Sequence, residues 1–91
     1  MGYTIIFVGK VIRKDLPDLP KTIRLRVVKA INERLTADPI NLGEPLHHSL
    51  KGRRRLRVGD YRVVYRVNQS EHVVVITEIG HRSTIYEKAR D

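Results

Sequence analysis

The residues with the clearest chemical potential are arginines that a β-hairpin would gather on one face. Two strand-like runs, Leu50–Val58 and Tyr61–Val67, flank the pair Gly59-Asp60. Glycine accepts the positive φ of the first central position in a type II′ turn, so this pair predicts a tight hairpin with Val58 opposite Tyr61. Alternate residues of a strand share a face. One face then holds Leu56, Val58, Tyr61, Val63 and Tyr65, and the other holds Arg53, Arg55, Arg57, Arg62 and Arg66.

This arginine face would be unfavourable if folding were its only purpose. The predicted register sets Arg57 opposite Arg62 and Arg53 opposite Arg66, and such like-charge pairs destabilise a sheet by up to about 1 kcal/mol each. Guanidinium groups, however, bind phosphates through two parallel hydrogen bonds and stack on bases. The alternative is a solvated face that serves solubility, for which Lys or Glu would be at least as suitable. The residue types therefore favour a nucleic-acid surface.

Composition limits the classes of function. The 91 residues suit one domain, residues 1–91, with a single thin core. The chain holds 18 Lys and Arg against 10 Asp and Glu, and the net charge of +8 favours a polyanion or an acidic protein as partner. Cysteine is absent from the sequence, which excludes disulfides and thiolate chemistry, and we expect a cytoplasmic location. The longest apolar runs, Ile5–Val8 and Val73–Ile76, are too short to cross a bilayer, so no membrane association is expected.

The first half of the sequence predicts a strand and then a helix. Tyr3–Val8 is β-branched and aromatic, which is typical of a strand. Over Leu16–Leu35, apolar residues recur every three or four positions and draw one stripe down a helix. Pro20 fits the first turn of that helix. A loop over residues 38–48, with two prolines, would end the helix and lead to the hairpin.

The second half predicts an antiparallel meander completed by His72–Ile79, and Thr84-x-x-Glu87 has the spacing of a capping box that opens a short C-terminal helix. The run Val73–Ile76 puts apolar groups on both faces of its strand, so the C-terminal helix and a partner protein are expected to cover the second face. The fold class is therefore α+β. We expect a four-stranded, mainly antiparallel sheet, formed by the N-terminal strand and the three-stranded meander. The N-terminal helical region would pack on one face.

Three sequence motifs resemble those of the RelE branch of the RelE/ParE toxins. They are Leu56-Arg57-Val58-Gly59-Asp60-Tyr61-Arg62-Val63-Val64-Tyr65, Ile79-Gly80-His81-Arg82 and Ile85-Tyr86. The predicted order of elements also agrees, so the resemblance covers essentially the whole chain. It implies the toxin of a type II toxin–antitoxin system, a ribosome-dependent endoribonuclease that cleaves mRNA with neither metal nor cofactor. It also implies a cognate RelB-like antitoxin as partner, with operator DNA bound only through the antitoxin complex.

The resemblance implies roles for individual residues. Arg62 and Arg82 match the active-site arginines of the family, and Tyr86 matches the tyrosine that is its candidate for activating the nucleophile and stacking on a base. Arg53 and Arg55 stand where close relatives carry lysines, so the positive charge is kept but no group that could lose a proton remains. Further RNA contacts are expected from Arg57, Arg66 and His81, although His81 suits a simple turn residue equally well.

Several residues have simpler interpretations. Strand parity assigns Tyr61 and Tyr65 to the core. His47 and His48 lack a third ligand at a recognisable spacing, so no metal site is expected. Two other functions remain open on the same scaffold: a ParE-like inhibitor that binds DNA gyrase without cutting RNA, and a decayed toxin that acts only as a corepressor with its antitoxin. The pairing of Arg82 with Tyr86 favours the ribonuclease.

Overall fold

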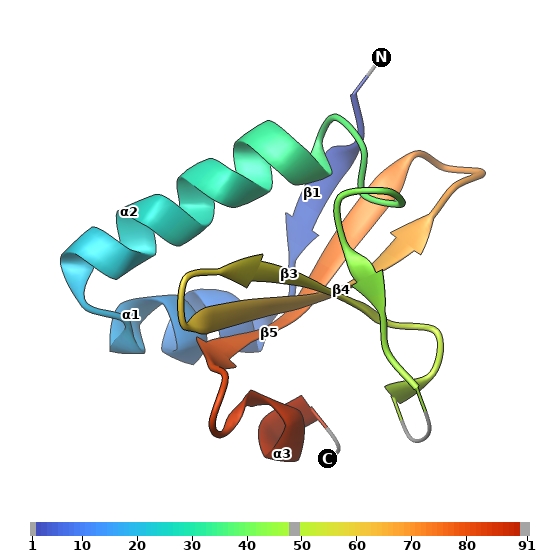
Figure 1. Ribbon diagram of the computed structural model, residues 1–91. Helices are drawn as coiled ribbons and strands as arrows, with labels where there is room; N and C mark the ends of the chain where they lie inside the picture. The colour runs from blue at the N-terminus through green and yellow to red at the C-terminus, as the bar shows by residue number, and fades with distance from the viewer. Residues whose placement is uncertain (1, 48–49, 90–91) are drawn as a thin grey trace.

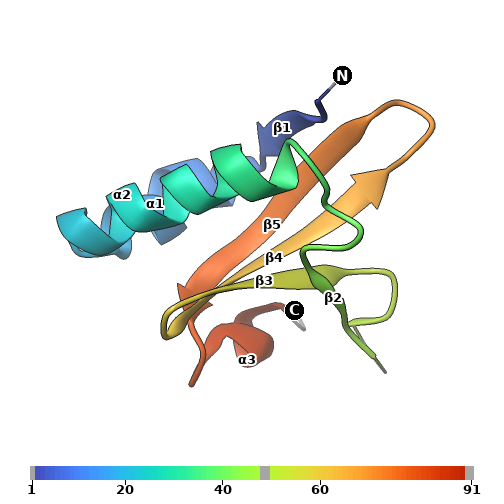
Figure 2. The ribbon, with the colours of Figure 1, turned by 45° about the horizontal axis from the view of Figure 1, so that its top comes forward.

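In the computed structural model, a layer of helices lies on one face of a sheet and a short helix lies on the other (Figures 1 and 2). The structure describes residues 2–47 and 50–89, and within them the sheet has five strands in the order β1-β5-β4-β3-β2. The strands are β1 (Thr4–Phe7), β2 (Glu44–Pro45), β3 (Arg54–Val58), β4 (Tyr61–Asn68) and β5 (Val73–His81). None of the helices in this part of the chain is long and apolar enough to cross a membrane.

The sheet differs from the predicted four-stranded, mainly antiparallel sheet in two respects. It is mixed, because β1 pairs in parallel with β5, whereas the other neighbours are antiparallel. It also has an additional strand, β2, inside the segment predicted as a loop. Two residues, one of them a proline without an N–H, are too few to produce the alternation by which a strand is recognised.

The helical layer consists of two helical segments where one helix was predicted. The first is η1 (Val11–Asp15) continued by α1 (Leu16–Asp18), and the second is α2 (Lys21–Ala30) continued by η2 (Ile31–Leu35). The break falls at Leu19, which is extended with φ −77° and ψ 141°, because the residue before a proline is disfavoured in the helical region. Pro20 therefore precedes α2 and does not lie within a continuous helix.

The main core lies between the helical layer and the sheet. Val27, Ile31 and Leu35 of the second helical segment are buried against sheet residues that include Val63 and Tyr65. Tyr65 is confirmed as a core residue, and its hydroxyl donates a hydrogen bond to the Pro39 carbonyl at 2.7 Å. Burial raises the pKa of this phenol. Tyr61 is partly buried against the same cluster.

A second, smaller cluster covers part of the opposite face. It joins Leu46, Leu50 and Val64 to Ile85, the first residue of α3 (Ile85–Ala89). The C-terminal helix thus covers part of this face at Val64, but the cluster includes no residue of the run Val73–Ile76, for which this cover was expected. Farther out on β1, Ile6 remains 47% exposed.

The β3–β4 hairpin forms in the predicted register. Gly59 has φ 59°, and the pairs run from Val58 with Tyr61 to Arg54 with Tyr65. The predicted opposition of Arg53 and Arg66 is wrong, because β3 begins at Arg54. The backbone of Arg53 instead closes a turn, in which its N–H donates to Leu50 at 3.1 Å and its carbonyl accepts from Leu46 at 2.9 Å.

Candidate functional site

The contact between Arg55 and Tyr86 joins the arginine face to the C-terminal helix. Arg55 Nη1 donates a hydrogen bond to the Tyr86 hydroxyl oxygen at 2.7 Å, and the guanidinium carbon lies 5.9 Å from the centre of the ring. The hydrogen bond to Tyr86 raises the pKa of Arg55, against the opposing effect of burial. The fully buried Ile85 anchors α3 to the sheet, which fixes the position of the neighbouring tyrosine. Two of the predicted site residues therefore meet.

Glu44 also belongs to this site, although the sequence analysis did not identify it. Its Oε1 atom lies 3.4 Å from Arg55 Nε and 3.1 Å from Arg57 Nε. The pairing of β2 with β3 sets Glu44 opposite Arg55. An isolated acid before Pro45 carries no signal of this pairing in the sequence, because the strand that positions it is only two residues long.

Arg62 and Arg82 both lie at the β3–β4 turn. Arg62 Nη1 donates to the carbonyls of Gly59 at 2.9 Å and Tyr61 at 2.8 Å. The backbone N–H of Arg82 donates to the Asp60 carbonyl at 2.9 Å, and its Nε lies 3.7 Å from a carboxylate oxygen of the same aspartate. The Arg82 side chain is 62% exposed, which leaves it accessible to a ligand.

Other predicted RNA contacts lie apart from these groups. His81 pairs across the strands with Tyr61 and meets that ring edge-on, with the centroids 5.3 Å apart. Because Tyr61 packs on the helical side of the sheet, His81 shares that side and not the side of Tyr86. Arg66 is exposed beside the β4–β5 turn, near the other end of β4 from Arg62. The arginines thus form a band along the hairpin, not one tight cluster.

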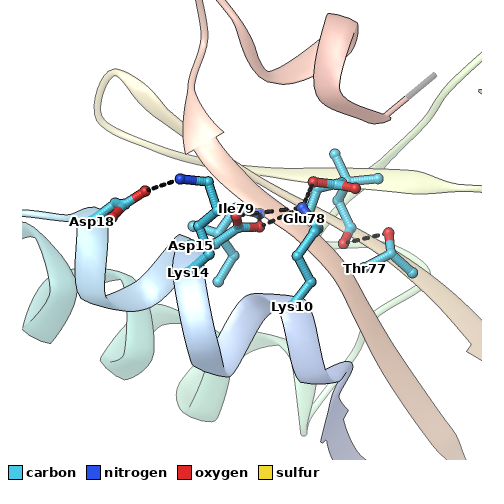
Figure 3. A network of polar contacts seen from close by, with 8 residues as sticks. Lys10, Lys14, Asp15, Asp18, Thr77, Glu78 and Ile79 are labelled. Atoms are coloured by element: carbon cyan, nitrogen blue, oxygen red, sulfur yellow. Dashed lines mark hydrogen bonds and ion pairs between the residues drawn. The ribbon is translucent and has the colours of Figure 1, made fainter. Parts of the chain in front are cut away.

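A buried polar network holds the end of β5 that leads to Arg82 (Figure 3). The side chain of Asp15 is fully buried, and its Oδ2 accepts hydrogen bonds from the Ile79 N–H at 3.0 Å and from Lys10 Nζ at 3.1 Å. Lys10 also contacts the carboxylate of Glu78. Burial lowers the pKa of Lys10, but the hydrogen bonds with Glu78 and Asp15 outweigh this effect and raise it overall.

The two histidines weighed as metal ligands do not provide a site in the described structure. His47 is exposed, and His48 lies outside the described residues. Residues 2–47 and 50–89 contain no group of three or more His, Asp or Glu side chains that could hold a metal ion. The groups that the described structure brings together at this site are guanidinium cations, the Tyr86 phenol and the Glu44 carboxylate. Such a set can bind phosphate oxygens, stabilise charge on them and exchange a proton at the hydroxyl.

Comparison with known proteins agrees with this fold. The family model for the ParE toxin of the type II toxin–antitoxin system parDE matches residues 6–86. Toxin RelG of Mycobacterium tuberculosis is 36% identical over 88 residues, 97% of this chain and 100% of RelG. Toxin RelE of the same organism is 40% identical over 73 residues, 80% of this chain and 75% of that toxin. The crystal structure of the toxin–antitoxin complex RelBE2 from Mycobacterium tuberculosis matches with a TM-score of 0.83 and 35% identity, covering 90% of this chain and 100% of the other.

Proposed function

Because this chain belongs to the ParE toxin family of type II toxin–antitoxin systems, within the RelE/ParE superfamily, we propose that it is a ribosome-dependent endoribonuclease. It would cleave mRNA without a metal ion or cofactor and so inhibit translation. The observation that carries this proposal is the 2.7 Å hydrogen bond between Arg55 and Tyr86 on a basic face. A phenol held by a guanidinium beside further arginines suits a reaction on a phosphodiester.

The proposed reaction is an attack by the 2′-hydroxyl of a nucleotide on its own 3′-phosphate. The 2′-oxygen forms a bond to phosphorus while the bond to the leaving 5′-oxygen breaks. Tyr86 in its phenolate form would accept the proton of the 2′-hydroxyl, or its ring would stack on the neighbouring base, and the leaving 5′-oxygen would take up a proton from water. Arg82 and Arg62 would stabilise the additional charge on the phosphoryl oxygens. Arg62 would first break its hydrogen bonds to the carbonyls of Gly59 and Tyr61. Binding to the ribosome would hold the RNA in line and lower the demands on the base.

The proposed protein partner is a RelB-like antitoxin. The RelBE2 structure, to which this chain is similar, is that of a toxin–antitoxin complex. The net charge of +8 suits an acidic partner, and partly exposed apolar residues such as Ile6 give it a surface to bury. We propose that operator DNA is bound only through this complex.

The test is a translation reaction programmed with a defined mRNA and analysed by primer extension, with and without ribosomes. We expect cleavage at discrete positions that requires both the protein and ribosomes, and loss of cleavage when Arg82 is replaced by Ala. Intact mRNA in the presence of active ribosomes would refute the ribonuclease. It would leave the decayed toxin as the better description.

The match to the ParE family model also favours a second candidate, an inhibitor of DNA gyrase. Such an inhibitor would act by binding alone and would not need a phenol fixed by a guanidinium. A supercoiling assay with purified gyrase separates the two, because the ribonuclease leaves supercoiling unchanged.

A further inference from the structure

One carboxylate oxygen lies between two guanidinium groups on the arginine face. Glu44 Oε1 is 3.4 Å from Arg55 Nε and 3.1 Å from Arg57 Nε. These arginines are two positions apart on β3, so their side chains leave the same side of the strand. The side chains of Glu44 and Arg57 are 51% and 57% exposed, whereas that of Arg55 is 25% exposed. The oxygen therefore marks a point at the surface where both guanidinium groups can meet one anion.

We propose that Arg55 and Arg57 form a subsite for one phosphate of an RNA backbone, and that Glu44 occupies this subsite until the phosphate displaces it. A non-bridging phosphate oxygen has the same charge-assisted hydrogen-bonding capacity as a carboxylate oxygen. The identity of the ligand rests on the proposed function, since RNA is the phosphodiester that the protein would meet. The site itself rests on the positions of the three side chains.

The hydrogen bonds explain how the exchange can occur without disturbing Tyr86. Arg55 uses Nε toward Glu44 and Nη1 toward Tyr86, so the first contact can be replaced while the second remains. A phosphate bound between Arg55 and Arg57 then lies next to the residue that holds the phenol. Displacement of Glu44 is easy, because ion pairs at an exposed surface contribute little stability and are screened by salt.

The subsite has a consequence for selectivity. Arg55 and Arg57 together carry two positive charges, and Glu44 lowers the net charge of the group to one. Free RNA is therefore bound more weakly than it would be by the two arginines without Glu44. Glu44 thus weakens the binding of free RNA, that is, RNA that is not held by the ribosome.

The test compares the binding of a fluorescent, single-stranded 2′-O-methyl RNA, which cannot be cleaved by its own 2′-hydroxyl, to wild-type protein, Glu44→Gln and Glu33→Gln. Glu33 is an exposed acid of η2, so its replacement changes the net charge equally at another place. Fluorescence anisotropy should show that Glu44→Gln binds about three- to tenfold more tightly than Glu33→Gln at low salt, with a smaller difference at higher salt. Adding Arg57→Ala to Glu44→Gln should abolish that gain. Equal affinities of the two single variants, or weaker binding by Glu44→Gln, would overturn the proposal.

The outcomes of this experiment distinguish failure of the subsite from failure of the proposed ribonuclease function. Tighter binding by Glu44→Gln in a protein that leaves mRNA intact in the translation reaction would support the subsite and refute the ribonuclease. Ribosome-dependent cleavage by a protein whose two glutamate variants bind RNA equally would support the ribonuclease and refute the subsite.

Discussion

The carboxylate of Asp15 accepts a hydrogen bond from the backbone N–H of Ile79, with 3.0 Å between Oδ2 and N. The pairing of β1 with β5 ends at Phe7 and Ile76. Beyond that point the side chain of Asp15, from η1, accepts the hydrogen bond at Ile79 that a neighbouring strand would otherwise accept. Lys10 contacts both Asp15 and Glu78 and offsets their charge. This contact secures the end of β5 from which the chain continues to Arg82.

Replacement of Asp15 by Ala should destabilise the fold strongly. It leaves a buried N–H without this acceptor and removes one of the two carboxylates that pair with Lys10, and breaking such buried interactions costs about 2–4 kcal/mol. Urea denaturation followed by circular dichroism measures the change. Asp18→Ala is the matched control, because the i,i+4 pair of Asp18 with Lys14 is exposed and its loss should cost less than about 0.5 kcal/mol. Similar losses in the two variants would contradict the structural role of Asp15.

Stability should fall at alkaline pH. The pKa values of Lys10 and Tyr65 are both raised in the folded protein, above their ordinary values of 10.5 and 10.0. A group with a raised folded pKa contributes stability that is fully present below its unfolded pKa and is lost as the pH rises through its folded pKa. The free energy of unfolding should therefore decline above about pH 10. Lys10→Arg, which stays charged in this range, should show a shallower decline in urea denaturation between about pH 8 and about pH 11. An identical decline would exclude Lys10 as a cause.

Arg62→Ala and Arg82→Ala should each relieve growth arrest in cells that lack the antitoxin. Loss of one donor to a developing phosphoryl charge typically lowers the rate about 10²-fold or more. Primer extension in the translation reaction measures the rate, and co-purification with the antitoxin shows that the variants still fold. Arg13→Ala, which removes an exposed cation from the helical side, should remain toxic. Full toxicity of both site variants would refute their assignment to catalysis.

The hydroxyl and the ring of Tyr86 can be separated by mutation. Tyr86→Phe keeps the ring, so if the hydroxyl exchanges the proton, cleavage should fall about 10²-fold while RNA binding changes little. Arg55→Lys should also reduce cleavage, since an ammonium group cannot reproduce the separate Nε and Nη1 contacts with Glu44 and Tyr86. Single-turnover cleavage on programmed ribosomes gives both rates. Wild-type cleavage by Tyr86→Phe would restrict the tyrosine to stacking.

Gly43→Ala should disturb the strand that carries Glu44. A Cβ atom at residue 43 would lie 1.7 Å from the Tyr65 hydroxyl and 3.0 Å from the Arg55 carbonyl oxygen. We expect a destabilisation of about 1–3 kcal/mol from overpacking, measured by thermal unfolding. Gly52→Ala is a useful comparison, because its φ of 93° is unfavourable for alanine, but among the described residues no atom beyond its chain neighbours lies within 4 Å of the added Cβ. A smaller effect at Gly43 than at Gly52 would contradict the close packing of the residue that precedes β2.

The sequence predicted the hairpin well, because its register depends on two adjacent residues. Gly59 and Asp60 alone fix the alignment of β3 with β4, which the structure confirms from Val58–Tyr61 to Arg54–Tyr65. The break at Leu19 was missed because the apolar stripe continues across it: both helical segments turn the same kind of face toward the sheet. The parallel pairing of β1 was missed for a different reason. The direction of this pairing depends on the path that the chain takes through the helical layer between β1 and the rest of the sheet, and no local sequence pattern indicates that path.

For the candidate site, the sequence indicated the arginines and the resemblance indicated Tyr86. The structure shows which of them meet, since contacts such as Arg55 with Tyr86 depend on how α3 packs on Val64 through Ile85. Residues such as Asp15 and Glu44 had no signal of their own. An isolated acid gains a role only when the fold sets it beside a cation or a backbone N–H.

The pairing of Thr4 with Val73 also affects how the protein folds during its synthesis. Contacts so distant in the sequence require closure of a long loop before they contribute any stability, and folds rich in them form slowly. During synthesis β1 emerges first and has no partner until β5 follows. The N-terminal strand therefore stays unpaired until β5 has been made, and the sheet that carries the arginine band is complete only after β5 has left the ribosome that made it.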